Sequence, residues 1–429
     1  MLDKRIFSQL EINHPMLAAV FKEHWQTPLD QYTALLYDKD RVSIEPELRD
    51  AFCSEWECYG KNKKETEQLL DELESTPVLQ TSHHVTPTNG PTFLAYDLIS
   101  LAGLRENKTY MVAANSGVAF SNPAWSGALS YGQLSLDWLL LKNTNAYRQA
   151  EKSARDRSKD GQADNRISLI PAKMRDQLVF GTRISDFQVS LFNQFAAGLK
   201  EISIPMVTDQ VYSIWASGFC SRVQSAIFQG KHILYFDVNR VISRYIVHIL
   251  QSRTKHPLLE ILFSDRINKK INEKFENPVF FQGNWEGKKS FKVDGLRWQF
   301  SRLIGEKSGI RELGRQQLIE ELQQETLCPG IFLQFFILRF LNGICCLGSF
   351  NQIEYMESYR RGWSDLKTGW QLFTDPDYRE TLTTGRLINK GKAVWPLDLA
   401  LKGDTINLQQ YLKMEMSYFW EPIVKQILL

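Results

Sequence analysis

Two adjacent histidines, His83 and His84, are the residues whose types and position best fit chemistry. They lie in the segment SHHVTPTNGP, residues 82–91, where proline, asparagine and glycine form a turn. An imidazole can bind an anion or move a proton near neutral pH. A turn that leads into a helix also exposes backbone N–H groups at the positive end of the helix dipole. The pair therefore predicts a catalytic site at His83 and His84, with Asn89 and Gly90 as substrate-binding residues of the turn.

The histidine pair does not indicate a metal site. Neighbouring residues on a strand point to opposite faces, so His83 and His84 cannot easily bind one ion. No cysteine, aspartate or glutamate nearby in the sequence completes a zinc set. The alternative to a functional role is a histidine that merely caps the turn. We expect no metal, and we expect one imidazole to face a ligand while the other braces the turn.

The segments around the histidines predict a βαβ unit. A short strand leads into the histidine loop, and GPTFLAYDLISLAGL, residues 90–104, has apolar residues at helical spacing. Pro91 suits the first turn of that helix. The next segment, TYMVAANSGVAF, residues 109–120, is typical of a buried strand that ends in a loop of small residues. Strand, helix and strand in this order predict a parallel sheet and an α/β fold.

Three further segments carry polar residues that a ligand could contact. The first, NSGVAFSN, follows the second strand, and ligands of parallel sheets bind beyond the carboxyl ends of the strands. The others are GSFNQ, which follows a long apolar run, and the basic segment PAKMR. Each alone also fits an ordinary loop, a helix cap or a surface ion pair. From these segments the predicted substrate-binding residues are Asn115, Ser116, Ser121, Asn122, Lys173, Arg175, Gly348, Ser349, Asn351 and Gln352.

Composition and charge limit the class of protein. Of 429 residues, 43% are hydrophobic and 23% charged, and the net charge of +2 gives no signature of nucleic-acid or membrane binding. Six cysteines without a CxxC pair are not a disulfide scaffold, and adjacent Cys345 and Cys346 fit a core. The start has no signal-peptide core, and polar residues interrupt the apolar run 330–348, which predicts a buried helix. We therefore expect a cytoplasmic protein without membrane contact.

The chain divides into three regions by sequence pattern. Residues 1–76 are rich in helical, charged segments, and residues 77–306 carry the predicted α/β core with a charged insertion near 150–166. Residues 307–429 are predicted to be mostly helical and to complete the site. Within the core, Asp294–Gly295 predicts the turn of a β-hairpin. No hydrolase, kinase, Walker A, GxGxxG or HExxH motif is present.

Two segments resemble the bacillithiol synthase family of cysteine-adding enzymes. TSHHVTPTNGPTFLAYDLIS, residues 81–100, aligns without a gap, with His83 and His84 on the family's two glutamines and Gly90 on the glycine of its Gly-Pro. CPGIFLQFFILRFLNGICCLGSFNQIEYM, residues 328–356, is similar to a second family motif after one gap. The matching residues of this second segment are Pro329, Gly348, Ile353 and Tyr355.

The resemblance implies a Rossmann-like core with a helical, partly coiled-coil portion. It also implies an enzyme that adds an amino acid to a small acceptor. This sequence departs from the family at three polar positions, because histidines replace the glutamines and NSGVAFSN replaces an acidic loop. In the second motif the family's acid falls on the amide Gln352. This chain can therefore share the fold of the family without sharing its substrate.

Three hypotheses of function follow. The first is a C–N bond-forming enzyme of thiol or natural-product biosynthesis, which joins a cysteine-like amino acid to a small amine- or hydroxyl-bearing acceptor. The second is a transferase that takes its amino acid from an aminoacyl-tRNA or a carrier protein. The third is a binding or scaffold protein that has lost catalysis. The sequence does not identify an activating cofactor, for which an adenine nucleotide is the candidate. It also does not decide whether the chain forms a homodimer.

Overall fold

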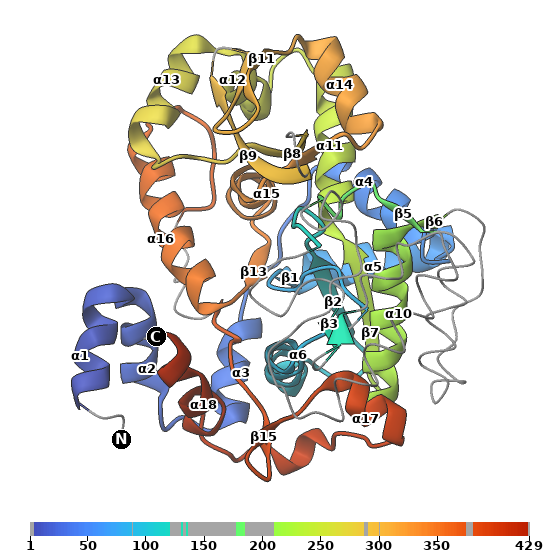
Figure 1. Cartoon of the computed structure of the whole chain (residues 1–429), viewed down its shortest axis with the longest axis vertical. Helices are drawn as coiled ribbons and strands as arrows, with labels where there is room; N and C mark the ends of the chain where they lie inside the picture. The colour runs from blue at the N-terminus through green and yellow to red at the C-terminus, as the bar shows by residue number, and fades with distance from the viewer. Residues whose placement is uncertain are drawn as a thin grey trace.

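The chain forms a mixed α/β structure in which helices surround a small parallel sheet (Figure 1). The structure is a computed structural model that describes residues 4–87, 89–120, 130–131, 134–135, 177–184, 210–286, 291–299, 301–374 and 381–427. The parallel sheet contains four strands, which are β1 (Val78–Gln80), β2 (Thr109–Ala114), β7 (His232–Asp237) and β13 (Cys345–Leu347).

The strands follow the order β13-β1-β2-β7, and all neighbouring pairs are parallel. Helix α6 (Pro91–Gly103) connects β1 to β2, with Pro91 in its first turn. The predicted βαβ unit is therefore confirmed. The chain proceeds from β1 to β2 to β7 and then returns to the other side of β1 with β13. The direction of winding thus reverses between β1 and β13, a position that in open α/β sheets opens a crevice at the carboxyl ends of the strands.

Alternate residues of the strands enter two different hydrophobic cores, as the period of two in a strand requires. On one face Val78, Val112 and Leu347 pack with α6 and with α10 (Tyr212–Ile227). On the other face Leu79 and Cys346 pack with α4 (Pro46–Glu57), α5 (Lys63–Ser75) and α11 (Val238–Ser252). Both faces of the sheet are therefore covered, which explains the nearly continuous apolar runs of its strands.

The N-terminal region consists of helices, as the sequence predicts. Asn62 begins α5 with a capping box: its side chain accepts from the Glu65 N–H at 3.1 Å, and the Glu65 carboxylate accepts from the Asn62 N–H at 2.9 Å. The described helices of this region are α1 (Lys4–Asn13), α2 (Pro15–His24), α3 (Leu29–Tyr37), α4 (Pro46–Glu57) and α5 (Lys63–Ser75).

A five-stranded antiparallel sheet forms the upper part of Figure 1. Its spatial order is β11-β10-β9-β8-β12. The hairpin predicted at Asp294–Gly295 was wrong, because both residues lie inside β9, where they pair with Gly283 and Gln282 of β8. Long-range pairing has overridden a strong local turn signal. The five strands are β8 (Phe281–Glu286), β9 (Phe291–Gln299), β10 (Arg302–Gly305), β11 (Gly309–Glu312) and β12 (Leu327–Pro329).

The apolar run 330–348 is only partly the helix that its sequence predicts. It forms α15 (Ile331–Phe335), continues as one π-helical segment, η4 (Phe336–Leu341), and ends in strand β13. Cys345 and Cys346 are buried, as predicted, but they lie in that strand. No described helix is long and apolar enough to cross a membrane.

The C-terminal region contributes to both sheets. The predicted boundary at residues 306–307 falls between β10 and β11, which pair with each other, and β13 completes the parallel sheet. Its last helix, α18, packs against the N-terminal helices, where the Phe21 and Trp420 ring centroids are 4.7 Å apart. The remaining helices are α11 (Val238–Ser252), α12 (Pro257–Phe263), α13 (Asp265–Lys274), α14 (Arg315–Gln323), α16 (Phe350–Asp365), α17 (Pro396–Lys402), the 3₁₀ turn η6 (Leu408–Gln410) and α18 (Ser417–Ile427).

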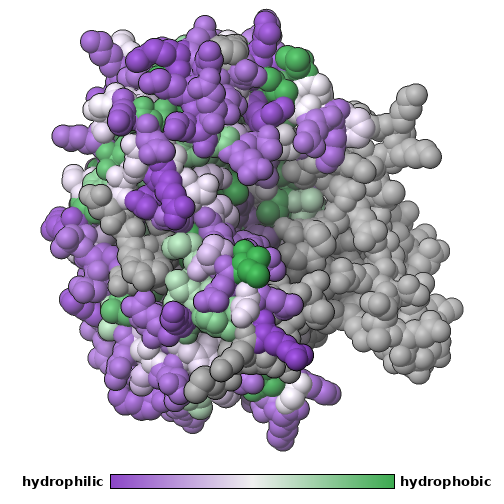
Figure 2. All heavy atoms as spheres, turned by 90° about the vertical axis from the view of Figure 1, so that its left-hand side faces the viewer, coloured by the Kyte–Doolittle hydropathy of each residue, from purple (hydrophilic) through white to green (hydrophobic). Residues whose placement is uncertain are grey.

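Three short two-stranded pairs complete the described elements. They are β3 (Ser130–Tyr131) with β4 (Leu134–Ser135), β5 (Arg183–Ile184) with β6 (Gln210–Val211), and β14 (Ile388–Asn389) with β15 (Lys392–Ala393). In the coloured part of Figure 2 most side chains at the surface are hydrophilic, and the hydrophobic ones form small separate groups. Such scattered groups are ordinary for a protein surface.

Candidate functional site

The loops that follow the four parallel strands meet at one edge of the sheet, which we call the carboxyl edge. The loop after β1 extends the sheet: His84 pairs with Asn115 in a parallel bridge, and the Asn115 N–H donates to the His83 carbonyl at 2.7 Å. Gly348 follows β13 directly, and Gln352 lies in the first turn of α16. The predicted residues of three separate segments are therefore brought to one edge.

His83 is buried beneath helix α6. Its ring stacks on Phe93, with centroids 4.8 Å apart, and packs edge-on against Tyr235 and Tyr96. Its Nε2 lies 3.1 Å from the Asp97 Oδ1, but the N–H is not aligned for a hydrogen bond. Asp97, also fully buried, accepts hydrogen bonds from the Tyr235 and Tyr110 hydroxyls at 2.6 and 2.9 Å. His83 is thus the histidine that braces the turn.

His84 is the histidine beside Asn115, and it is only partly buried. Its ring contacts Phe93 edge-on, with centroids 6.0 Å apart. Burial lowers the pKa of His84 to about 4, and the neighbouring His83 adds to the shift. His84 is therefore neutral near pH 7. A neutral imidazole can donate and accept one hydrogen bond each, but a base with so low a pKa accepts protons weakly.

Asn89 and Gly90 connect the histidine loop to α6. Asn89 is buried, and its amide donates to the Tyr235 hydroxyl at 3.3 Å. Its Oδ1 has no hydrogen-bond partner in the described part of the chain. Gly90 is the residue before the first turn of α6 and, as a glycine, has no side chain to cap this helix. The free N–H groups of a helix start favour a negatively charged group there.

Ser116 links β2 to the start of α11. Its hydroxyl donates to the Asp237 Oδ1 at 2.7 Å, and its N–H donates to the Asn239 side chain at 2.9 Å. Asp237 also accepts from the Asn239 N–H, so it caps the helix. Gly117 fits closely in this network, because a Cβ there would lie 2.6 Å from the Gln282 Oε1. Ser116 is fully buried and fixes the edge instead of facing solvent.

Gln352 joins the two loops at the point where the winding reverses. Its Nε2 donates to the Thr81 hydroxyl at 2.9 Å and to the Cys346 carbonyl at 3.0 Å. Its Oε1 accepts from the Thr81 and Ser82 hydroxyls at 3.2 and 3.3 Å. These contacts satisfy the buried amide, so Gln352 holds the loops and has little capacity left for a ligand.

The other predicted residues of this segment differ in exposure. Gly348 is buried, Ser349 is half-buried just before α16, and Asn351 is exposed. Ser121, Asn122, Lys173 and Arg175, and the charged insertion near 150–166, lie outside the residues that the structure describes. Within the described ranges, no group of three or more histidine, cysteine, aspartate or glutamate residues could hold a metal ion.

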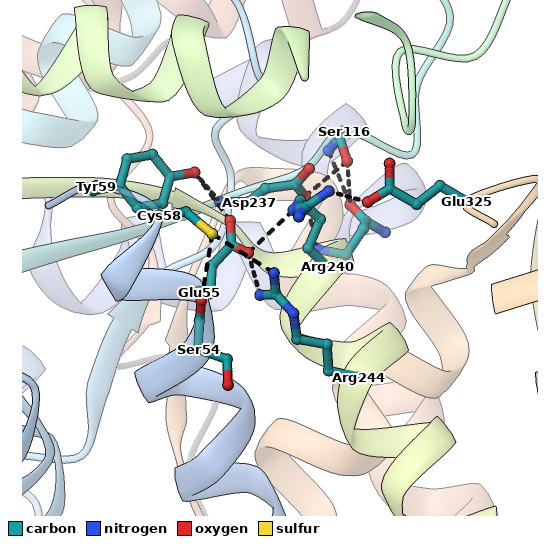
Figure 3. Close-up of polar contacts among 10 residues, drawn as sticks. Ser54, Glu55, Cys58, Tyr59, Ser116, Asp237, Arg240, Arg244 and Glu325 are labelled. Carbon is teal, nitrogen blue, oxygen red and sulfur yellow. Dashed lines mark hydrogen bonds and ion pairs between the residues drawn. The ribbon is translucent and has the colours of Figure 1, made fainter. Parts of the chain in front are cut away.

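An ion-pair cluster beside the carboxyl edge was not predicted from the sequence. Glu55 of α4 is fully buried and pairs with Arg240 and Arg244 of α11, and Arg240 also pairs with Glu325 (Figure 3). Burial raises the pKa of Glu55, although the two arginine charges oppose the shift. Glu55 is at least 185 positions away in the sequence from its two arginine partners on α11. No local sequence pattern could therefore have revealed the cluster.

A groove of about 440 Å³ runs along α11 next to this cluster. Besides Arg240, Arg244 and Glu325, it is bordered by Phe180 and His248. Both arginines are already paired with carboxylates, so the groove offers no excess positive charge. We therefore place the candidate site at the carboxyl edge and keep the groove as the competing location.

A second unpredicted segment, residues 381–386, extends the carboxyl edge beyond β13. Leu382 forms a parallel bridge with Gly348, and the Thr383 N–H donates to the Gly348 carbonyl at 2.9 Å. The Thr383 hydroxyl accepts from the Gln80 Nε2 at 2.8 Å, which ties the segment to β1. The sequence of this segment, TLTTGR, contains three threonines. These hydroxyls are the only local feature that could have indicated a binding segment.

The fold and the edge define a mixed α/β protein with a four-stranded parallel sheet and a polar site candidate at the carboxyl ends of its strands. Comparisons with protein-family models, with curated proteins and with solved structures find no match to this chain.

Proposed function

We propose that this chain is an enzyme that forms a C–N bond between an amino acid and a small amine-bearing acceptor. The observation that carries the proposal is the junction of the two segments, 81–100 and 328–356, that resemble a cysteine-adding family. They lie side by side, because the Thr81 N–H donates to the Leu347 carbonyl at 3.0 Å and the Gln352 amide donates to the Thr81 hydroxyl. Strand β1, which ends directly before the first segment, pairs with β13 inside the second. Segments so far apart would not need to meet if the resemblance were accidental.

We further propose that the parallel sheet is the core of a Rossmann-like fold. The order β13-β1-β2-β7, with helices on both faces, supports this proposal because it matches half of a doubly wound sheet. In such folds ligands bind where the winding reverses, which here is between β1 and β13. The partly coiled-coil portion that the resemblance implies is a separate expectation, and the longest described helices, α10 and α16, have 16 residues each.

The chemistry of amide formation suits an uncharged polar edge beside a helix start. The attacking amine must be neutral, and the carbonyl oxygen becomes negative as the bond forms. The N-terminus of α6, where Gly90 has no capping side chain, would stabilise this developing charge. Neutral His84 and the Asn115 side chain, which is partly exposed, would orient the acceptor by hydrogen bonds. We assign His83 the role of holding the loop in place.

The test is a reconstituted reaction analysed by mass spectrometry. Purified protein is incubated with an amino-acid mixture that includes cysteine, with a library of amine-bearing acceptors, and with or without ATP. The proposal predicts a product whose mass equals amino acid plus acceptor minus one water. His84→Ala should lower the rate about 3- to 10-fold, the value of one neutral hydrogen bond. A loss of about 10² or more would instead indicate proton transfer by His84.

The matched control is His232→Ala. His232 is exposed and begins β7, so it lies at the opposite edge of the same sheet. Its replacement should leave the rate unchanged. Ribonuclease treatment should also leave the yield unchanged, whereas its loss would favour transfer from an aminoacyl-tRNA. Absence of any condensed product with all acceptors would contradict the proposal and favour a binding protein.

A further inference from the structure

Arg386 is a half-buried arginine that no carboxylate of the described residues neutralises. Its Nε is buried and has no hydrogen-bond partner there, and burial lowers the pKa of the guanidinium. The other arginines near the carboxyl edge differ from it, because Arg240 and Arg244 both pair with Glu55. A charge that is partly removed from water costs free energy, and no carboxylate of the described residues offsets that cost for Arg386.

The backbone holds Arg386 in a fixed place. Its N–H donates to the Phe419 carbonyl of α18 at 2.9 Å. The preceding Gly385 lies against α6, since a Cβ there would be 3.1 Å from the Ile99 Cδ1. The Trp420 indole donates to the Thr384 carbonyl at 3.0 Å. The backbone of the segment is thus anchored by two helices, which limits the space that the Arg386 side chain can sample.

Two hydroxyl groups accompany the guanidinium. The buried Thr384 hydroxyl donates to the buried Tyr96 hydroxyl at 3.5 Å, and Tyr96 is near enough to raise the pKa of the Arg386 guanidinium against the effect of burial. The Tyr96 ring packs edge-on against His83, with centroids 5.7 Å apart. Arg386 is therefore connected through one side chain to the histidine loop. Positive charge with neighbouring hydroxyls is the arrangement that binds carboxylate or phosphate oxygens.

We propose that Arg386, with the Thr384 and Tyr96 hydroxyls, is a subsite for an anionic group, a carboxylate or a phosphate, of the substrate. The inference builds on the proposed function, since it gives that site a substrate class with at least one negative charge. The guanidinium would form charge-assisted hydrogen bonds to the anion, and the ligand would supply the partner that the described residues do not. The subsite itself is a binding feature and can be tested without a turnover assay.

The test measures binding of simple anions to the full-length chain. Thermal unfolding is followed in sodium phosphate and in sodium succinate, each against sodium chloride of equal ionic strength. At least one anion should raise the unfolding temperature of the wild type beyond the effect of chloride. Arg386→Gln should weaken the apparent affinity for that anion by about 10- to 100-fold, as expected for a lost charged hydrogen bond. Arg386→Lys should keep part of it as a point charge.

The matched control is Arg222→Gln. Arg222 is another half-buried arginine whose pKa burial lowers, but it lies on α10. This variant should bind the anion like the wild type. Phosphate and succinate separate the two possible sources, a phosphorylated ligand and a carboxylic acid. The proposal is overturned if neither anion stabilises the wild type, or if the Arg386→Gln protein binds as tightly as the wild type. Anion binding without any condensed product would refute the proposed function and leave the subsite standing.

Discussion

Replacement of His83 tests the role of this residue as a brace. The His83→Ala substitution removes a fully buried ring that stacks on Phe93 and packs against Tyr96 and Tyr235. It also removes one polar partner of Asp97. Buried aromatic rings cost about 3–5 kcal/mol when they are truncated to alanine, because a cavity remains. We expect the free energy of unfolding to fall by about this amount.

The His83→Phe substitution separates packing from polarity. It keeps a ring in the same space, so most of the contacts with the three neighbouring rings remain. Asp97 loses its contact with the Nε2 but keeps the Tyr235 and Tyr110 hydroxyls as donors. We expect a loss of about 1–3 kcal/mol, the cost of one unmade polar contact in the interior. The exposed His232 is the control, and His232→Ala should change the stability by less than about 0.5 kcal/mol.

The assay is urea-induced unfolding, followed by tryptophan fluorescence near pH 7. The midpoint of each urea transition is converted to a free energy of unfolding with the m-value, the slope of free energy against urea concentration. The comparison requires that all variants have the same m-value. The brace interpretation requires the order of loss to be alanine, then phenylalanine, then the His232 control. A His83→Ala protein with the wild-type midpoint would show that the ring does not carry this part of the core, and the interpretation would fail.

Three further changes should follow from the hydrogen bonds of the edge. Gln352→Glu should lower the free energy of unfolding by about 2–4 kcal/mol near pH 8, because two donated hydrogen bonds are lost and a carboxylate is buried. Urea unfolding near pH 5 should show a smaller loss of stability, because the new carboxyl group becomes protonated. Asp237→Asn should be neutral or stabilising near pH 7, because burial raises the pKa of Asp237. The folded wild type then loses stability as the pH rises above the pKa of an unfolded aspartate, about 3.9, and through the raised folded pKa. The advantage of the variant should therefore grow as the pH rises above about 4 in the same assay, and a constant difference would contradict this. Gly117→Ala should cost about 1–3 kcal/mol, because its Cβ would crowd the Asn115 Oδ1 and the Asn239 Nδ2, which hydrogen bonds hold in place. Calorimetry showing an unchanged unfolding temperature would count against the packing at this glycine.

The local pattern of the sequence was sufficient to predict the βαβ unit. Apolar periodicity, Pro91 at a helix start and the polar loop at Asn115 are all properties of neighbouring residues, and the structure has them as predicted. Parallel topology then brings the loops to one edge, since parallel strands share their carboxyl ends. The part of the site that depends on β1 and β2 was therefore accessible from the sequence.

The remainder of the edge depends on contacts that are distant in the chain. Strand β13 has three residues inside an apolar run, and it is a strand because Cys345 pairs with Val78. The turn signal at Asp294–Gly295 failed for the same kind of reason, because β8 recruits both residues into a ladder. Arg386 has no pattern around it in the sequence, and only the structure reveals that its charge has no acidic partner among the described residues.

Hydrogen–deuterium exchange tests most directly whether the two distant segments form one substrate site. The wild-type chain is compared with and without amino acid, acceptor and ATP, and peptides across the described residues are analysed by mass spectrometry. We predict slower exchange on ligand addition in peptides that cover residues 81–91 and, together with them, in peptides that cover residues 345–356. Protection confined to residues 240–251, along the groove of α11, or to only one of the two segments, would contradict the account.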